Sequence, residues 1–313
     1  MSKYIFGVDI GGTTVKIGLF TDAGELKDKW EITTRTDEGG KFILGDIAES
    51  VKAKVEEKGI SADDIKGIGM GVPGPVKEDG TVIRCANLGW GIFNCAEELS
   101  KLTGFKVKAG NDANMAALGE AGFGGGKGYD SVVMVTLGTG VGGGIIIGGR
   151  MLYGVNGAGG EIGHITVNEE ETVTCGCGRK GCLEQYTSAT GIVRLANNAL
   201  NNTDRPSSLR SVQYVSAKEI FDAAKNGDDL ALELIDNFGK TLGKALANIA
   251  CVVDPDVFVI GGGVSKAGQI IPDTVEKYFK ENAFHACKGT KFALAELGND
   301  AGMYGGAFLI LSE

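Results

Sequence analysis

The sequence lacks three features that would each assign it to a familiar class. No uninterrupted apolar run approaches the roughly 18 residues of a membrane-spanning helix, so we expect no membrane partner. Acidic residues outnumber basic ones by 40 to 31, for a net charge of −9, which argues against nucleic-acid binding because that function favours a basic face. The chain begins Met-Ser-Lys-Tyr and continues at once as a strand-like run, so we expect no signal peptide and a cytoplasmic location.

Histidine is scarce, with two residues in 313, whereas glycine is abundant, with 52. The usual share of glycine is about 7%, so this chain holds more than twice that share. The glycines follow no G-X-Y repeat, which excludes collagen. They cluster after apolar runs instead, where a backbone turns sharply or approaches a ligand closely.

Apolar periodicity predicts strands that alternate with helices. Helices are indicated at Ile43–Val55, before Gly59, and at Leu230–Val253, where Asp254-Pro255 ends the pattern. Six apolar runs read as strands: Tyr4–Val8, Val15–Phe20, Ile65–Val72, Val132–Leu137, Gly144–Ile147 and Val257–Ile260. This alternation is typical of the α/β class.

One pattern occurs twice. Tyr4–Phe20 and Ser131–Gly149 each read as strand, glycine-rich turn, strand. Two such hairpins predict a duplicated α/β unit with a cleft between the halves. Two glycine-rich turns facing each other would suit one ligand that carries several phosphates.

The first turn carries a carboxylate and several polar groups. Its backbone N–H groups can cradle phosphate oxygens, and Asp9 can hold Mg²⁺ directly or through water. The alternative is an ordinary hairpin turn. The candidate residues are Asp9, Gly11, Gly12, Thr13, Thr14 and Lys16.

The second turn, Gly138–Gly144, contains G-x-G-x-x-G, with Glu161 following 18 residues after Gly143. We reject a dinucleotide fingerprint because that motif opens a helix, whereas Gly144-Ile-Ile-Ile continues as a strand. A phosphate-binding hairpin fits better. A third glycine run, Gly261–Gly263 before Val264, is either a tight turn or a close approach to a flat ring such as adenine.

Asn111 and Asp112 precede a helical run, Ala113–Glu120. Either residue can cap that helix. Asp112 can also act as a general base, since phosphoryl transfer to an alcohol needs a carboxylate that accepts the hydroxyl proton. The two roles are compatible.

A cluster of potential metal ligands follows. His164, Cys175, Cys177 and Cys182 match a tetrahedral Cys₃His zinc site, and four protein ligands make such a zinc structural. The alternatives are free thiols or a redox pair. Glu161 and Glu184 flank the cluster, so the loop would fix both carboxylates where they can accept hydrogen bonds from several hydroxyls.

These motifs together resemble the ROK family (repressor, open reading frame, kinase). The resemblance covers essentially the whole chain and is specific in the order of its parts. They are DIGGTTVK at 9–16, GVPGPV at 71–76, NDAN at 111–114, GTGVGGG at 138–144, EIGH at 161–164, CGCGRKGCLE at 175–184 and GGGV at 261–264.

The resemblance implies the duplicated, ribonuclease-H-like ATPase fold of sugar kinases and actin, with two domains around a cleft. The expected domains are residues 1–112 plus 301–313, and residues 113–300 with the zinc loop. Asp112 would be the general base, and His164 would place one ring nitrogen on zinc and the other towards the sugar. The implied sugar ligands are Gly71 (through its backbone), Asn111, Asp112, Glu161, His164 and Glu184. Phosphate would bind to Gly11, Gly12, Thr13, Thr139 and Gly140, and adenosine would lie near Gly262, Gly263 and Val264.

The implied activity is ATP- and Mg²⁺-dependent phosphorylation of a hexose, most similar to the family's glucose-phosphorylating members. Fructose, mannose, allose and N-acetylhexosamines are alternative substrates, and polyphosphate is an alternative donor. Family repressors carry an added DNA-binding domain, for which the strand starting at Tyr4 leaves no room. A zinc-stabilised sugar-binding protein without catalysis is the remaining alternative. A homodimer or homotetramer is expected from the resemblance.

Overall fold

The computed structural model describes residues 3–312. Its contacts divide the chain into two compact units. The first comprises Met1–Asp130, Gly144–Gly160 and Leu297–Glu313, and the second comprises Ser131–Gly143 and Glu161–Glu296.

The first unit is built on a five-stranded sheet with the order β3-β2-β1-β4-β7. Strands β1, β2 and β3 pair antiparallel, whereas β4 and β7 run parallel to β1. The strands of this sheet are β1 (Tyr4–Ile10), β2 (Thr14–Thr21), β3 (Leu26–Thr33), β4 (Ile65–Val72) and β7 (Val107–Asn111). Between β4 and β7 in the chain, β5 (Thr81–Val82) and β6 (Phe93–Asn94) form a separate two-stranded sheet. The helices are α1 (Asp37–Gly40), α2 (Ile43–Glu57), α3 (Cys95–Thr103), α4 (Asp112–Phe123) and α10 (Ala301–Leu311).

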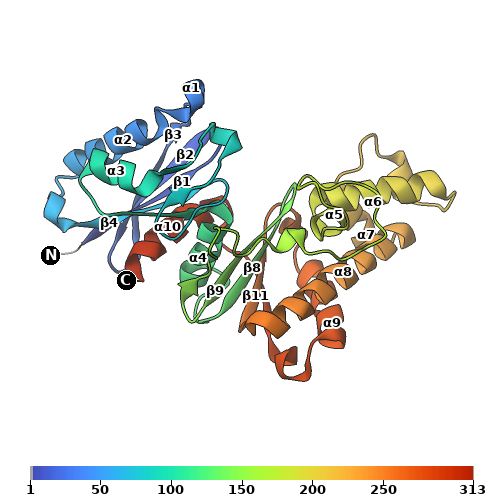
Figure 1. Ribbon diagram of the computed structural model, residues 1–313. Coiled ribbons are helices and arrows are strands. Elements are labelled where there is room, and N and C mark those ends of the chain that lie inside the picture. Colours follow the sequence, from blue (N-terminus) through green and yellow to red (C-terminus); the bar gives the residue numbers. More distant parts are fainter. Residues whose placement is uncertain (1–2, 313) are drawn as a thin grey trace. The chain divides into compact units, whose positions relative to one another are not determined.

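Successive side chains of β1 point to opposite faces of the sheet, and each face packs against different helices. Phe6, Val8 and Ile10 are buried in one core with residues of α2 and α3. Ile5 belongs to a second core with Met303 and other residues of α10, on the other side of the sheet (Figure 1). Each large apolar side chain buried in this way stabilises the fold by roughly 1.5–3 kcal/mol. Asp9 follows the period of Ile5 and therefore points to the α10 side.

Helix α10 lies very close to its neighbours because glycines line the contacts. A Cβ on Gly69 of β4 would collide with the carbonyl of Gly306, and one on Gly305 would collide with the carbonyl of Met115 in α4. The buried carboxylate of Glu120 in α4 adds a polar tie, since it accepts hydrogen bonds from the N–H groups of Gly125 and Leu297, at 2.9 and 2.8 Å.

The second unit is built around β8 (Val132–Leu137), which pairs parallel with β11 (Val257–Gly261), which in turn pairs parallel with β12 (Lys291–Leu294). Every residue of β11 is buried, as expected for a parallel strand covered on both faces. The order of the sheet to which β8 belongs is β10-β9-β8-β11-β12, with β9 (Val141–Ile147) next to β8. The contact division assigns Val141–Gly143 of β9 to the second unit, and the rest of β9 and all of β10 (Arg150–Met151) to the first. The helices are α5 (Glu184–Thr187), α6 (Ala189–Asn202), α7 (Ala217–Lys225), α8 (Asp229–Val253) and α9 (Ile270–Asn282).

The two sheets share one strand order once each is numbered from its own first strand, 3-2-1-4-5. The predicted duplication of the strand–turn–strand hairpin is therefore confirmed. The predicted α/β class, the six strands and both helices are confirmed as well, and α8 ends where Asp254 adopts a left-handed conformation, with φ of 44°. Within residues 3–312, no helix is long and apolar enough to cross a membrane.

The units differ from the expected domains chiefly in α4 and residues 144–160, which have most of their contacts with the first unit. Helix α4 belongs there because Gly119 and Gly305 let it lie against α10. The expected domain boundaries at residues 112 and 301 stay a prediction.

Candidate functional site

The first glycine-rich turn joins β1 to β2 in the first unit. The N–H group of Gly11 donates to the carbonyl of Thr14, and Thr34 donates through its N–H to Thr13 and through its hydroxyl to Gly11, at 2.8–2.9 Å. These bonds hold the turn's carbonyls, while Gly12, Thr13 and Thr14 are exposed. A Cβ on Gly12 would meet no atom within 4 Å, so the fold itself does not require glycine there and the space is open to a ligand.

Asp9 lies beside this turn and has an unusual environment. A Cβ built on Gly302, at the start of α10, would lie 2.7 Å from Asp9 Oδ1. Burial, and then the negative charge of Asp112, raise the pKa of Asp9 to about 6; Lys16 lowers it and Asp300 raises it. A carboxylate in this position is costly to ionise unless a cation is bound near it.

Lys16 has partners that the sequence motif did not indicate. Its Nζ donates to the carbonyl of Asn299 at 2.7 Å and lies 3.5 Å from Asp300 Oδ1. Asp300 also pairs with Lys29, at 2.7 Å. Although burial acts to raise it, these two lysines lower the pKa of Asp300 below its usual value. Lys16 is therefore tied to the start of α10, nearly 300 residues away in sequence.

Strand register brings the next candidates together. Asp9 lies opposite Gly71, and Gly71 lies opposite Gly110, on three neighbouring strands. Asn111 then caps α4, since its Oδ1 accepts from the N–H groups of Ala113 and Asn114, at 2.9 and 3.2 Å. The capping interpretation is confirmed.

Asp112 is the first residue of α4, and its Oδ1 accepts from the N–H of Ala113 at 2.9 Å. The side-chain Nδ2 of its neighbour Asn111 donates to the carbonyl of Gly74, at 3.0 Å. The helix start thus fixes both side chains at the end of β7. In the first unit, Asp9, Gly71, Asn111 and Asp112 are brought together at the carboxyl ends of β1, β4 and β7.

The second glycine-rich turn joins β8 to β9, so a strand follows it and the rejection of a dinucleotide helix is confirmed. The N–H of Gly138 donates to the carbonyl of Gly140 at 3.0 Å. The N–H of Val141 donates to Glu184 Oε2, also at 3.0 Å. Glu184, predicted as a sugar ligand, thus has a structural partner that sequence reasoning missed.

A cavity of about 720 Å³ adjoins this turn in the second unit. Gly263 and Val264, two of the three residues predicted to lie near adenosine, line it, whereas Gly262 is not among its lining residues and the α7 residues were not predicted. Its lining comprises Gly138, Thr139, Ala189, Ser216, Ala217, Lys218, Phe221, Asp222, Gly263, Val264, Lys266 and Ala267. The volume falls in the usual range for a ligand pocket, roughly 300–1,000 Å³.

The predicted metal ligands converge in the same unit. The ligand atoms of His164, Cys175, Cys177 and Cys182 all lie within 4.8 Å of one another. Sγ of Cys177 and Sγ of Cys182 are 3.6 Å apart, and Sγ of Cys175 is 3.9 Å from Nδ1 of His164. Zinc–ligand bonds of about 2.0–2.3 Å in a tetrahedron give separations near these values, whereas a disulfide needs about 2.05 Å. All seven cysteines, each within the described part of the chain, are free.

His164 has its two ring nitrogens in different surroundings. Nδ1 faces Cys175, and Nε2 lies 4.0 Å from Glu161 Oε2. Burial raises the pKa of Cys182 to about 12, whereas a hydrogen bond from the Arg179 backbone lowers that of Cys177.

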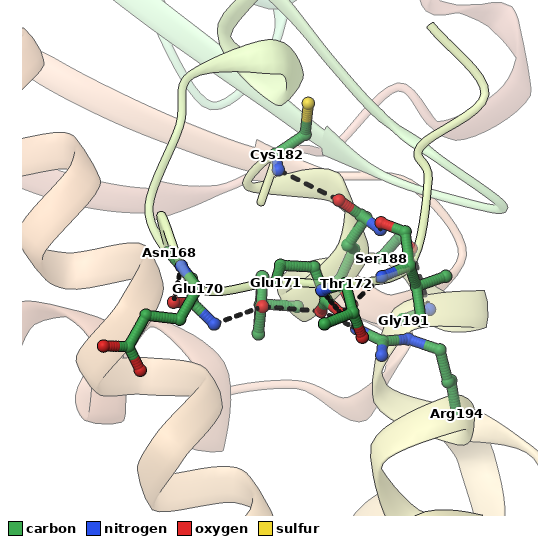
Figure 2. Close-up of polar contacts among 11 residues, drawn as sticks. Asn168, Glu170, Glu171, Thr172, Cys182, Ser188, Gly191 and Arg194 are labelled. Carbon is green, nitrogen blue, oxygen red and sulfur yellow. Dashed lines mark hydrogen bonds and ion pairs between the residues drawn. The ribbon is translucent and has the colours of Figure 1, made fainter. Parts of the chain in front are cut away.

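A polar network holds the cysteine-containing loop against α5 and α6 (Figure 2). Glu171 Oε2 accepts from the Tyr186 hydroxyl at 2.6 Å and from Arg194 at 3.0 Å. The hydrogen bond from Tyr186, aided by backbone N–H groups and Arg194, lowers the pKa of Glu171 to about 2. The N–H of Cys182 donates to Gln185 Oε1, at 3.1 Å. These hydrogen bonds anchor the loop to the two helices.

These observations agree with comparisons to known proteins. The chain belongs to the ROK family, whose model matches residues 5–313. Its fold is accordingly the duplicated, actin-like ATPase fold that the sequence predicted. A glucokinase from Halalkalibacterium halodurans is 42% identical over 99% of this chain and 96% of its own length. An N-acetylgalactosamine kinase from Shewanella sp. is 32% identical over 97% of this chain and 96% of its own length.

A solved structure adds the fold-level comparison. The ROK family glucokinase from Streptomyces griseus, crystallised in complex with glucose and AMPPNP, is similar with a TM-score of 0.73. The two sequences are 33% identical, and the match covers 99% of each chain.

Proposed function

We propose that the protein is an ATP-dependent, hexokinase-class glucokinase that transfers the γ-phosphoryl group of ATP to the 6-hydroxyl of glucose. The assignment of ATP as phosphoryl donor rests on the cavity of about 720 Å³ beside Thr139 and Gly263. Glucose as acceptor is supported by the similarity to proteins named glucokinase across nearly the whole chain.

Asp112 is the general base in this proposal. It accepts the proton of the 6-hydroxyl while that oxygen attacks the γ-phosphorus and the bond to the β-phosphate oxygen breaks, which gives ADP and glucose 6-phosphate. Its place as first residue of α4, where Asn111 satisfies the helix N-terminus, holds the carboxylate in a fixed position.

The glycine-rich turns bind the donor. Backbone N–H groups of Gly12, Thr139 and Gly140 hold phosphate oxygens, with hydroxyls of Thr13 and Thr14, while Gly11, whose N–H donates to the Thr14 carbonyl, shapes the turn around the phosphate. Gly262, Gly263 and Val264 lie against adenosine. Asp9 holds Mg²⁺, which fits its raised pKa because a bound cation offsets the cost of ionising that carboxyl group. Lys16 contributes positive charge while it remains paired with Asp300.

The sugar hydroxyls bind Asn111, Asp112, Glu161, His164 and Glu184, and the backbone near Gly71. Zinc would be held by His164, Cys175, Cys177 and Cys182, a donor set that fits a structural site. The ion would fix the orientation of the imidazole, so that its other ring nitrogen could face the sugar. We also propose a cytoplasmic location, where ATP is available, and a homodimer or homotetramer, which light scattering tests.

A second candidate substrate class is an N-acetylated hexosamine, favoured by the 32% identity to an N-acetylgalactosamine kinase. Coupled ADP release with Mg²⁺-ATP decides between the two. The panel is glucose, mannose, fructose, N-acetylglucosamine, N-acetylgalactosamine and N-acetylmannosamine. Glucose should give the highest kcat/KM. If another sugar gives the highest kcat/KM, the protein is still a kinase but its substrate differs. If none of the sugars causes ADP release, a sugar-binding protein or another phosphoryl donor is favoured.

A further inference from the structure

The phosphate turn of the second unit is held by one short segment of chain. The N–H of Ala189 donates to the carbonyl of Gly138 at 2.8 Å, and the hydroxyl of Thr190 donates to the backbone carbonyl of Thr139 at 2.7 Å. Glu184 Oε2 accepts the N–H of Val141, at 3.0 Å. Residues 184–190 thus contact the turn at both its start and its end.

Glycine at position 140 makes the Glu184 contact possible. A Cβ there would collide with Glu184 Oε2. Gly163, in the 3₁₀ turn Ile162–His164, makes a second close approach, since a Cβ there would collide with the carbonyl of Val141. Val141 therefore lies between the carboxylate of Glu184 and the 3₁₀ turn Ile162–His164, whose last residue belongs to the Cys/His cluster.

The same segment is continuous with the cysteine cluster. Glu184 follows Cys182 by two residues, and its second oxygen, Oε1, lies 3.6 Å from Cys175 Sγ. Gln185 accepts the N–H of Cys182 and donates to the carbonyl of Val173, at 3.1 and 2.9 Å. Ser188 caps α6 by accepting from Gly191 N–H at 2.9 Å (Figure 2). One carboxylate therefore contacts the cysteine cluster with one oxygen and the phosphate turn with the other.

We propose that Glu184 is a positioning residue for the phosphate turn, which ties the Cys/His loop to Gly138–Val141. Changes in that loop then alter nucleotide affinity as well as sugar affinity. This inference rests on the proposed function for the identity of the nucleotide, whereas the contact between Glu184 and Val141 is independent of it.

The test uses the full-length protein and two ligands, Mg²⁺-AMPPNP and glucose, each titrated alone by calorimetry. Glu184→Ala removes the acceptor for Val141 N–H and should weaken AMPPNP binding about tenfold, because a charged acceptor is lost. Glu184→Gln keeps an amide oxygen for that N–H and should bind AMPPNP within about twofold of wild type. Both variants should bind glucose more weakly, since neither keeps the carboxylate.

Two matched variants separate the contacts. Glu161→Ala removes the other carboxylate beside the cluster, which lies 4.0 Å from His164 Nε2, and should weaken glucose binding alone. Thr190→Val removes the hydroxyl that holds Thr139 and should weaken AMPPNP binding alone. Equal AMPPNP affinities for wild type and Glu184→Ala, or equal losses in Glu184→Ala and Glu184→Gln, would overturn the proposal.

Hydrogen exchange of the peptide spanning Gly138–Val141, measured without ligand, supplies a readout independent of binding. Faster exchange in Glu184→Ala than in Glu184→Gln supports the positioning role, and identical exchange in both overturns it. If wild type fails to bind AMPPNP, the proposed function fails, while the exchange comparison still decides the role of Glu184. If Glu184→Ala does not fold, Glu184→Asp replaces it in the same measurements, because its shorter side chain draws the carboxylate away from Val141 N–H. Weaker AMPPNP binding and faster exchange than in Glu184→Gln support the role, and equal values overturn it.

Discussion

Two adjacent glycines of the GGGV motif should respond to the same substitution in opposite ways. Gly263 has φ of −60° and ψ of −35°, and a Cβ there would meet no atom within 4 Å. Gly262 has φ of +85°, and a Cβ there would lie 2.5 Å from the carbonyl oxygen of Leu137. Only Gly262 is therefore required by the fold.

The magnitudes follow from these two environments. Gly263→Val adopts the native backbone without strain, so stability should stay within about 1 kcal/mol of wild type. Its side chain would enter the cavity beside Val264, and overpacking there costs roughly 1–3 kcal/mol, which corresponds to about a 5- to 150-fold rise in KM for ATP. Gly262→Val combines backbone strain of about 1–3 kcal/mol with overpacking of similar size.

The assays are thermal unfolding and initial-rate kinetics with ATP varied at saturating glucose. We expect a nearly unchanged Tm with a raised KM for Gly263→Val, and a strongly lowered Tm for Gly262→Val. A Gly263→Val enzyme with normal stability and normal KM for ATP would refute the assignment of the cavity to the nucleotide.

Three further predictions concern charge and metal. Asp9→Asn should raise the KM for Mg²⁺-ATP. Because burial raises the pKa of Asp9 from 3.8 to about 6, the ionised carboxylate destabilises the fold by an amount that grows between these pH values and is complete above them. Without metal, the variant should therefore melt at a higher temperature than wild type at pH 8 and at nearly the same temperature near pH 4. A lower Tm for Asp9→Asn than for wild type at pH 8 would show that the ionised carboxylate does not destabilise the fold. Glu171→Gln should lower Tm at neutral pH by an amount that shrinks as pH falls from about 4.5 towards 2, because the lowered pKa of Glu171 stabilises the fold only while the group is ionised; a pH-independent difference would contradict this. Cys177→Ala, or removal of zinc by a chelator, should lower Tm and raise the KM for glucose together, and an unchanged enzyme would remove the case for a structural metal.

Local patterns predicted much of this molecule. Strands such as Val132–Leu137 show in their apolar runs, and α8 shows in its 3.6-residue period and in the Asp-Pro that ends it. The Cys/His cluster was predictable too, since three of its four ligands lie within eight residues and their chemistry is specific. In each case the deciding interactions are local in sequence.

The missed features depend on partners that are distant in sequence. The contacts of Lys16 with Asn299 and Asp300 were not predicted, because no periodicity links positions so far apart, and its role as a phosphate ligand stays a prediction. The α7 residues that line the cavity belong to no nucleotide-binding motif. The capping box of Ser216 and Glu219 indicates in the sequence where α7 begins, but not that the helix lines a cavity. Glu184 was predicted for its carboxylate, while its contact with Val141 depends on how two segments pack.

The account depends most directly on Asp112, and one comparison tests it. Wild type and Asp112→Asn are incubated with Mg²⁺-ATP and glucose, and ADP and glucose 6-phosphate are quantified in the same samples. Wild type should form the two products in equal amounts. Asn keeps the oxygen that accepts Ala113 N–H, so the variant should fold and bind glucose, yet lose about 10²–10⁴-fold in kcat. A near-normal kcat in Asp112→Asn, or ADP formed without glucose 6-phosphate by wild type, would contradict the account.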